Sequence, residues 1–276
     1  MNTSRREFLR NASLATLVLG AGGFQSLSAK ELSELKERVK LRFLIASDAH
    51  YGQPKTPFEA MFDNFRDKAN LFQKQMPANF CVLNGDLIHD EPHLMPLVKA
   101  KADMLDLPYY VTKGNHDKIS DTEWENIWGM PVNFSFEEKG SAFLFATTSD
   151  EEGTYLSPDL TWMRNQLDAF TKVKNVFIFI HIPQAKWTAN GIETPEFFLL
   201  LRDYPNIKAV FHGHEHDQDG VRMHNGVPFI FDSHIGGSWG TDYKGFRVVE
   251  VLKDNSIVTY MMDPVKPMTK ETLKVG

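Results

Sequence analysis

The chain has 276 residues, of which 42% are hydrophobic and 24% are charged, and its formal net charge is −6. This length and composition predict a soluble globular protein with a substantial core, arranged as one large domain or two small ones. The acidic balance, without a basic block, argues against a nucleic-acid groove and against docking on anionic membranes. We therefore expect no nucleic-acid polymer as a partner, and an anionic substrate would have to be attracted by local charges such as bound cations.

Residues 1–29 differ from the rest of the chain. An arginine pair, Arg5 and Arg6, precedes an apolar run of small residues at 12–24, and a cleavage point is expected after Ala29. The segment resembles a bacterial twin-arginine signal peptide, which implies export, to the periplasm. The alternative is an amphipathic N-terminal helix, which a glycine break disfavours. The run is also shorter than the ~20 apolar residues of a membrane span, so no stable span is expected after processing.

The only cysteine, Cys81, lies in an apolar run and is predicted to be a buried strand residue. One cysteine can form neither an intrachain disulfide nor a thiolate metal site. An exported protein of this kind must be held together by its core or by metals.

Short apolar runs alternate with longer helical patterns after a charged helical lead-in at 30–40. The predicted strands are 41–47, 79–84, 107–112, 142–147, 175–181, 208–211, 227–232, 246–251 and 257–261. The predicted helices, each opened by a proline, are 57–74, 92–105 and 158–170. Alternation of strands and helices predicts mainly parallel pairing, and the last three strands predict an antiparallel meander. The economical interpretation is a single domain over 41–276.

Polar groups follow the ends of these strands directly. The blocks are Asp48-Ala49-His50, Gly85-Asp86, Gly114-Asn115-His116-Asp117, His181 and Gly213-His214-Glu215-His216. Each block alone is weak, since a turn or a core histidine explains it equally well. Because ligands bind at the carboxyl ends of strands in an α/β sheet, the blocks together predict one site at one edge.

In this order the blocks resemble the signature of the calcineurin-like metallophosphoesterase superfamily. The resemblance implies an α/β fold, a four-layer α/β/β/α sandwich with mixed sheets. It also implies two metal ions, and the ligands it assigns are Asp48, His50 and His216 for one ion, Asn115, His181 and His214 for the other, and Asp86 as the bridge. Imidazole, carboxylate and amide ligands without sulfur favour Mn, Fe, Zn or Co.

The same resemblance implies hydrolysis of a small-molecule phosphate ester by a hydroxide held between the metals. His116 would donate a proton to the leaving oxygen or stabilise the transition state, and Asp117 would orient the His116 ring and support its charged form. The motifs resemble bacterial cyclic-nucleotide and glycerophosphodiester phosphodiesterases, so a phosphodiester is the expected substrate. The alternatives are a phosphomonoester, a catalytically silent metal-binding domain and, disfavoured by the charge, a nuclease.

Other polar and aromatic residues near these blocks have competing interpretations. His89, Asp90 and His93 are expected in a solvated loop, although they follow Asp86 closely, and His212 is left unassigned. Candidates for a substrate pocket, against ordinary loop packing, are Tyr51, His234 and Trp239. His224 is expected in a hairpin turn.

Overall fold

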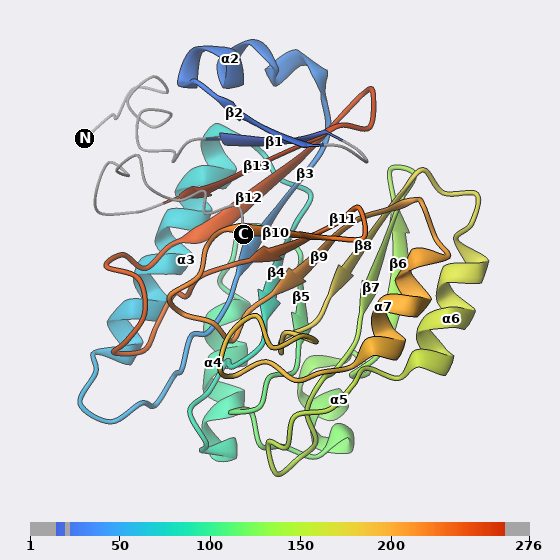
Figure 1. Cartoon of the computed structure of the whole chain (residues 1–276). Helices are drawn as coiled ribbons and strands as arrows, with labels where there is room; N and C mark the ends of the chain where they lie inside the picture. The colour runs from blue at the N-terminus through green and yellow to red at the C-terminus, as the bar shows by residue number, and fades with distance from the viewer. Residues whose placement is uncertain (1–14, 20–22, 263–276) are drawn as a thin grey trace.

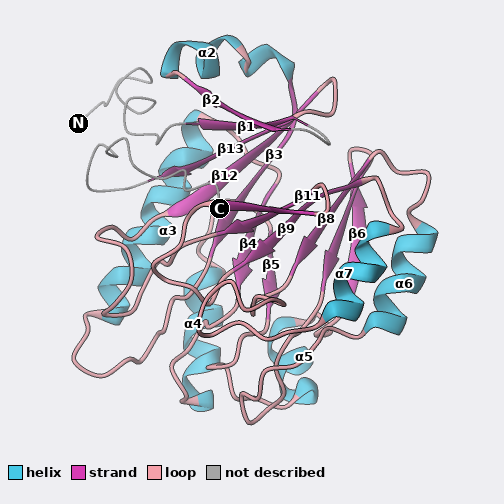
Figure 2. Ribbon diagram, viewed as in Figure 1, coloured by secondary structure: helices cyan, strands magenta, loops and turns pink. Residues whose placement is uncertain are grey.

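A computed structural model describes residues 15–19 and 23–262. Two β-sheets lie face to face, and helices cover the outer face of each sheet (Figure 1). Figure 2 shows the same four layers by secondary structure, with the strands between the helices. The predicted four-layer α/β/β/α sandwich with mixed sheets is therefore confirmed.

The first sheet has seven strands in the order β2-β1-β13-β12-β3-β4-β5. Its strands are β1 (Ala15–Leu19), β2 (Gly23–Leu27), β3 (Val39–Ala46), β4 (Phe80–Asn84), β5 (Tyr109–Thr112), β12 (Phe246–Leu252) and β13 (Ile257–Met262). Strands β3, β4 and β5 are parallel, whereas β12 pairs antiparallel with both β3 and β13. This sheet supplies three of the strand ends that carry the predicted site.

The second sheet has six strands in the order β10-β11-β9-β8-β7-β6. Its strands are β6 (Phe134–Glu138), β7 (Ser141–Phe145), β8 (Asn175–Phe179), β9 (Ile207–His212), β10 (Val221–His224) and β11 (Val227–Phe231). Strands β7, β8, β9 and β11 are parallel in the order β7-β8-β9-β11, and β6 and β10 pair antiparallel at the two edges. The predicted meander is wrong, because β11 belongs to this sheet and only β12 and β13 form the antiparallel pair.

Alternate side chains of each inner strand face the other sheet and the helices, so every sheet has one face that helices cover. In β3, Phe43 and Ile45 face the second sheet, whereas Leu44 and Ala46 face helices. The helices on the first sheet are α3 (Phe58–Gln75), α4 (Met95–Ala102) and α5 (Asp121–Trp128), and those on the second are α6 (Leu160–Ala169) and α7 (Pro195–Arg202). A 3-10 turn, η2 (Pro92–Leu94), precedes α4, so the predicted helix 92–105 is divided and ends early.

The layer between the sheets is rich in phenylalanine. Phe43 is fully buried and its ring lies 5.3 Å from that of Phe80, stacked at 9°. From the opposite sheet, Phe143 and Phe177 approach Phe43 edge-on. Aromatic rings contribute large apolar area, so this layer fixes the two sheets against each other and aligns their strand ends.

At the N-terminus, β1 pairs antiparallel with β13 and with β2. The lead-in is helical in α2 (Ala29–Glu34) and in η1 (Lys36–Arg38), and β3 begins at Val39. The arginine pair of the predicted signal peptide lies outside the described residues, so the signal stays a prediction. Among the described residues, no helix combines the length and apolar character needed to cross a membrane.

Candidate metal centre

The predicted ligands gather where strands of both sheets end. Asp48 follows β3, Asp86 follows β4 and Asn115 follows β5, all from the first sheet. His181 follows β8 and His214 follows β9, from the second. Because the two sheets face each other with their parallel strands ending on the same side, one edge of the sandwich collects all of these side chains.

The first group consists of Asp48, His50 and His216, whose ligand atoms lie within 4.8 Å of one another. The Nε2 atoms of His50 and His216 are 2.9 Å apart, and Asp48 Oδ1 is 3.2 Å from His216 Nε2. All three residues are buried. Two imidazole nitrogens and one carboxylate oxygen directed at the same point form a donor set suited to a transition-metal ion.

The second group consists of Asp86, His181 and His214. Asp86 Oδ2 is 3.1 Å from His181 Nε2 and 3.6 Å from His50 Nε2, which places this carboxylate between the two groups. In the same part of the site, Asn115 Oδ1 and His214 Nε2 are buried without a hydrogen-bond partner, and His181 Nε2 contacts the carboxylates of Asp86 and Asp48. Buried polar atoms in proteins almost always have partners, so the unpaired atoms of Asn115 and His214 next to these carboxylates fit a second cation.

The charge states of the histidines also fit metal binding. Burial lowers the pKa of His50 to about 3 and that of His214 to about 4, so both are neutral at physiological pH. Burial opposes a charge on His181 too, but Asp86 and Asp48 raise its pKa to about 10. Metal ligation requires neutral imidazole, so a metal ion at His181 would replace the proton that the two carboxylates otherwise stabilise at this position.

Several of these residues adopt left-handed backbone conformations that non-glycine residues rarely take. The φ angles are 57° at Asp48, 42° at His50, 52° at Asp86 and 70° at His214. Such conformations are costly and cluster at functional sites. They turn each side chain inward immediately after its strand.

Gly85 leaves the space that the His181 ring needs to approach Asp86 in the second group. Its φ is +85°, and a Cβ added there would lie 2.3 Å from His181 Nδ1. That nitrogen is 2.7 Å from the carbonyl oxygen of Asn84, so a shift of the ring would break this hydrogen bond. Only glycine lets the chain pass under His181 in this conformation.

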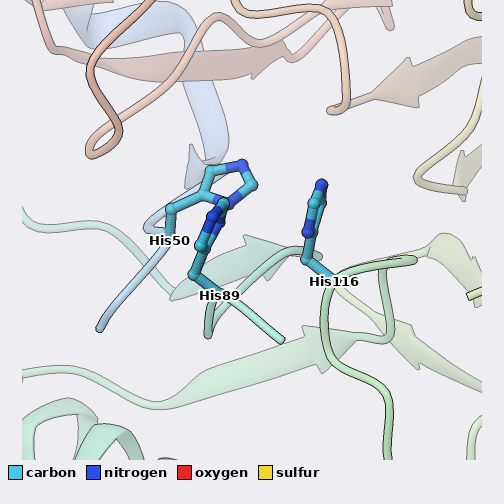
Figure 3. A group of neighbouring side chains, drawn as sticks. All are labelled: His50, His89 and His116. Carbon is cyan, nitrogen blue, oxygen red and sulfur yellow. The ribbon is translucent and has the colours of Figure 1, made fainter. Parts of the chain in front are cut away.

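His116 is half-buried beside His50 of the first group, with ring centroids 4.8 Å apart (Figure 3). Its Nδ1 is 3.1 Å from Asp90 Oδ1, and Lys118 Nζ lies 2.9 Å from the same oxygen. The backbone N–H of His116 donates to Asp86 Oδ1 over 2.8 Å, which fixes the His116 backbone beside the carboxylate between the two groups.

The role predicted for Asp117 needs correction. Its carboxylate is fully buried and accepts the backbone N–H groups of Leu87, Ile88 and Gly114. Asp117 therefore holds the loops after β4 and β5 together, and Asp90 is the carboxylate that contacts the His116 ring.

His89 also differs from its prediction as a solvated loop residue. Its Nδ1 is 2.9 Å from His50 Nδ1, and its ring stacks on that of His116 at 4.9 Å and 11°. Figure 3 shows the three rings side by side, each from a different loop. His93, in the same stretch, is exposed as expected.

A family model described as calcineurin-like phosphoesterase matches residues 41–218. The match spans every predicted ligand, from Asp48 to His216. The chain belongs to the calcineurin-like phosphoesterase family.

Relatives of this phosphoesterase include hydrolases of different substrates. A protein named serine/threonine-protein phosphatase CPPED1, from Danio rerio, is 30% identical over 219 residues, which cover 67% of this chain and 69% of the relative. A probable cyclic nucleotide phosphodiesterase from Psychrobacter arcticus is 22% identical over 175 residues, which cover 56% of this chain and 62% of that relative. The crystal structure of a dimetal phosphatase from Danio rerio matches with a TM-score of 0.66 at 14% identity, over 83% of this chain and 98% of that one. The family and the phosphatase relative support hydrolase activity.

The three predicted pocket residues of the phosphoesterase have different environments. Tyr51 is buried and packs edge-on against Phe58 of α3 at 4.7 Å, so its placement in a substrate pocket is wrong. His234 is fully buried behind His216, with ring centroids 4.6 Å apart, and supports that residue from the protein side. Trp239 alone is exposed, with 44% of its surface accessible, and it stacks on His216 at 4.4 Å and 13°.

One aromatic residue at the phosphoesterase site had no sequence signal. Tyr155 lies in the loop between β7 and α6, and its ring meets that of His214 edge-on at 4.9 Å. No motif surrounds it, and only the fold brings that loop to the metal ligands. Separately, His224 ends β10 beside the Asn225-Gly226 turn, as predicted.

Proposed function

We propose that this chain is a hydrolase of small phosphate esters that works with two bound metal ions. The convergence of the buried ligand groups carries the proposal, because the ligand atoms in each group lie within 4.8 Å of one another and Asn115 Oδ1 and His214 Nε2 have no hydrogen-bond partner. The ligands are Asp48, His50 and His216 for one ion and Asn115, His181 and His214 for the other, with Asp86 shared. Mn, Fe, Zn and Co all suit this donor set.

Two cations bound there would neutralise the phosphate group and lower the pKa of water enough to make hydroxide available near neutral pH. The protein contributes the surroundings of that chemistry. Asp48, His50 and His181 are fully or almost fully buried, which keeps the ligands dry and rigid.

His116 is the residue we assign to the leaving oxygen. Asp90 accepts at Nδ1, so an imidazolium at this position would keep its second proton on Nε2, free for transfer to the departing alcohol. The Asp90 carboxylate stabilises the charged ring that this requires. Lys118, paired with Asp90, adds positive charge near the leaving group.

For the substrate class we favour a phosphomonoester. The relative with 30% identity is named a phosphatase, and the alignment covers two thirds of both chains. A phosphodiester, the class expected from the sequence motifs, is the second candidate, since the relative with 22% identity is named a cyclic nucleotide phosphodiesterase. A catalytically silent domain is disfavoured because His116, Asp90 and the ligand groups are all in place.

The deciding experiment compares hydrolysis of an aryl phosphomonoester and an aryl phosphodiester by protein refilled separately with Mn, Fe, Zn or Co. Faster turnover of the monoester supports the favoured class. Preference for the diester transfers the assignment to the second candidate. Two bound metals without turnover of either ester would leave the silent domain as the better description.

We also propose that residues 1–29 direct export to the periplasm. Replacement of Arg5 and Arg6 by lysine should retain the protein in the cytoplasm of a bacterial host, as measured by cell fractionation. Equal periplasmic amounts of both forms would refute this route.

A further inference from the structure

The exposed aromatic side chains of the described residues lie at the metal centre. The large apolar side chains with substantial exposure are Leu71, Leu97, Met104, Tyr155, Leu156, Leu199 and Trp239. Only Tyr155 and Trp239 in this set are aromatic, and each contacts a histidine of the metal centre. Isolated exposed leucines are normal on protein surfaces, but two aromatic rings flanking one site point to a ligand.

Trp239 is held firmly by the segments that carry the metal ligands. The N–H of Gly236 donates to the carbonyl of Asp48 over 3.0 Å, and the N–H of Thr241 donates to the carbonyl of His216 over 2.9 Å. A Cβ at Gly236 would lie 1.8 Å from the carbonyl oxygen of Ala49, so this loop packs directly on the loop after β3. The indole is therefore pre-positioned, although nearly half of its surface is exposed.

Trp239 lies on the side of the site where the alcohol part of the substrate would leave. His116, which we assign to the leaving oxygen, stacks on His89, and the Trp239 ring centroid lies 6.2 Å from that of His89. Trp239 is also 4.9 Å from His50. The rings of His116, His89 and Trp239 thus form a row that begins at the proposed position of the leaving oxygen. The last ring, the indole of Trp239, is wide, flat and exposed.

Tyr155 bounds the site beside the other metal ligands. Its ring is partly exposed and meets that of His214 edge-on at 4.9 Å. The loop is anchored where the N–H of Leu156 donates to the carbonyl of Thr148 over 2.8 Å. Tyr155 and Trp239 are therefore placed on the His214 side and the His216 side of the centre.

We propose that the natural ester carries a flat, unsaturated ring on its alcohol part, and that this ring stacks on Trp239. The proposal rests on phosphate-ester hydrolysis at the same site. A phenol, as in tyrosine phosphate, and a nucleoside, as in a 5′-nucleotide, both offer such a ring. Glycerol phosphate offers none.

The test measures kcat/KM of the metal-loaded full-length protein for these three phosphates, in the wild type and in Trp239→Leu, Trp239→Phe and Leu199→Ala. Leu199 is an exposed residue of α7 and serves as the control for loss of surface apolar area. We expect Trp239→Leu to lower the preference for ring-bearing over glycerol phosphate about tenfold, the size of an aromatic stacking interaction. Trp239→Phe should keep most of the preference, and Leu199→Ala all of it. The better ring substrate distinguishes the phenol from the nucleoside.

Binding provides a readout that is independent of turnover. Phenylphosphonate should bind the metal-loaded protein more tightly than methylphosphonate, and Trp239→Leu should remove the difference. Equal affinities, or an unchanged preference in Trp239→Leu while glycerol phosphate is hydrolysed, would overturn this inference and leave the proposed function standing. Absence of hydrolysis of all three phosphates and of the aryl phosphodiester, with two metals bound, would overturn both.

Discussion

Replacement of Gly85 by alanine tests how the second ligand group is built. The φ of +85° costs a non-glycine residue about 1–2 kcal/mol. The new Cβ would also lie 2.3 Å from Nδ1 and 2.6 Å from Cγ of His181, and overpacking of this kind adds about 1–3 kcal/mol. We therefore expect Gly85→Ala to lower the free energy of unfolding of the chelated protein by about 2–5 kcal/mol, measured by urea denaturation.

The displaced His181 ring should also weaken metal binding. Its Nε2 is 3.1 Å from Asp86 Oδ2, so a shift of the ring separates two proposed ligands. We expect the variant to retain one metal per chain after dialysis, against two in the wild type, and to lose phosphate-ester hydrolysis.

Gly129 provides the matched control for Gly85. It ends α5 with φ +68°, and an added Cβ there meets nothing within 4 Å. Gly129→Ala should therefore cost only the conformational part, about 1–2 kcal/mol, and should keep both metals and full activity. Equal stability loss and equal metal content in the two variants would refute the steric argument at His181.

The other predictions concern single side chains. His116→Ala should lower kcat by about 10²–10⁴-fold with metal content unchanged, and loss of metal would contradict its assigned role. Asp90→Asn should lower kcat about tenfold in the same assay and leave the stability of the protein nearly unchanged, because the pair it forms is partly exposed. His212 is fully buried with both ring nitrogens unpaired, and burial lowers its pKa to about 3. Below about pH 6.5, His212 therefore binds a proton in the unfolded chain but stays neutral in the folded chain. The free energy of unfolding falls as the pH drops from 6.5 towards 3. His212→Phe should stabilise the chelated protein by about 1–3 kcal/mol at pH 7.5 and by more at pH 5, and a destabilised variant would contradict this. Cys81 is fully buried, which raises the pKa of its thiol, so a thiol reagent should react with it only after unfolding.

The sequence predicts the strands and the ligand blocks well because both depend on local pattern. Apolar runs such as 41–47 and 175–181 are close to the observed β3 and β8. The predicted elements do not include the strands β1, β2, β6 and β10 or the helices α5 and α7. In β6, for example, the residues are only partly buried and carry a weak apolar pattern. The predicted meander is wrong because the chain passes from the second sheet to the first between β11 and β12. No local sequence pattern indicates to which sheet a strand belongs.

The surroundings of the site were less predictable than its ligand blocks. Tyr51 follows His50 directly, but the left-handed φ of 42° at His50 turns the chain so that Tyr51 packs in the core. His89 and Asp90 resemble any solvated loop in sequence, and only the approach of the loop after β5 brings His116 to them. Contacts between loops of different strands depend on tertiary structure, which a single sequence does not reveal.

The most direct test of the account is a metal titration of the chelated full-length protein with Mn²⁺, following phosphate release from an aryl phosphomonoester. We predict that activity rises with added metal and reaches a plateau at two equivalents per chain, and that Asp86→Ala shows no such rise. Activity that is independent of added metal, or a plateau at one equivalent, would contradict a centre of two cations that share Asp86.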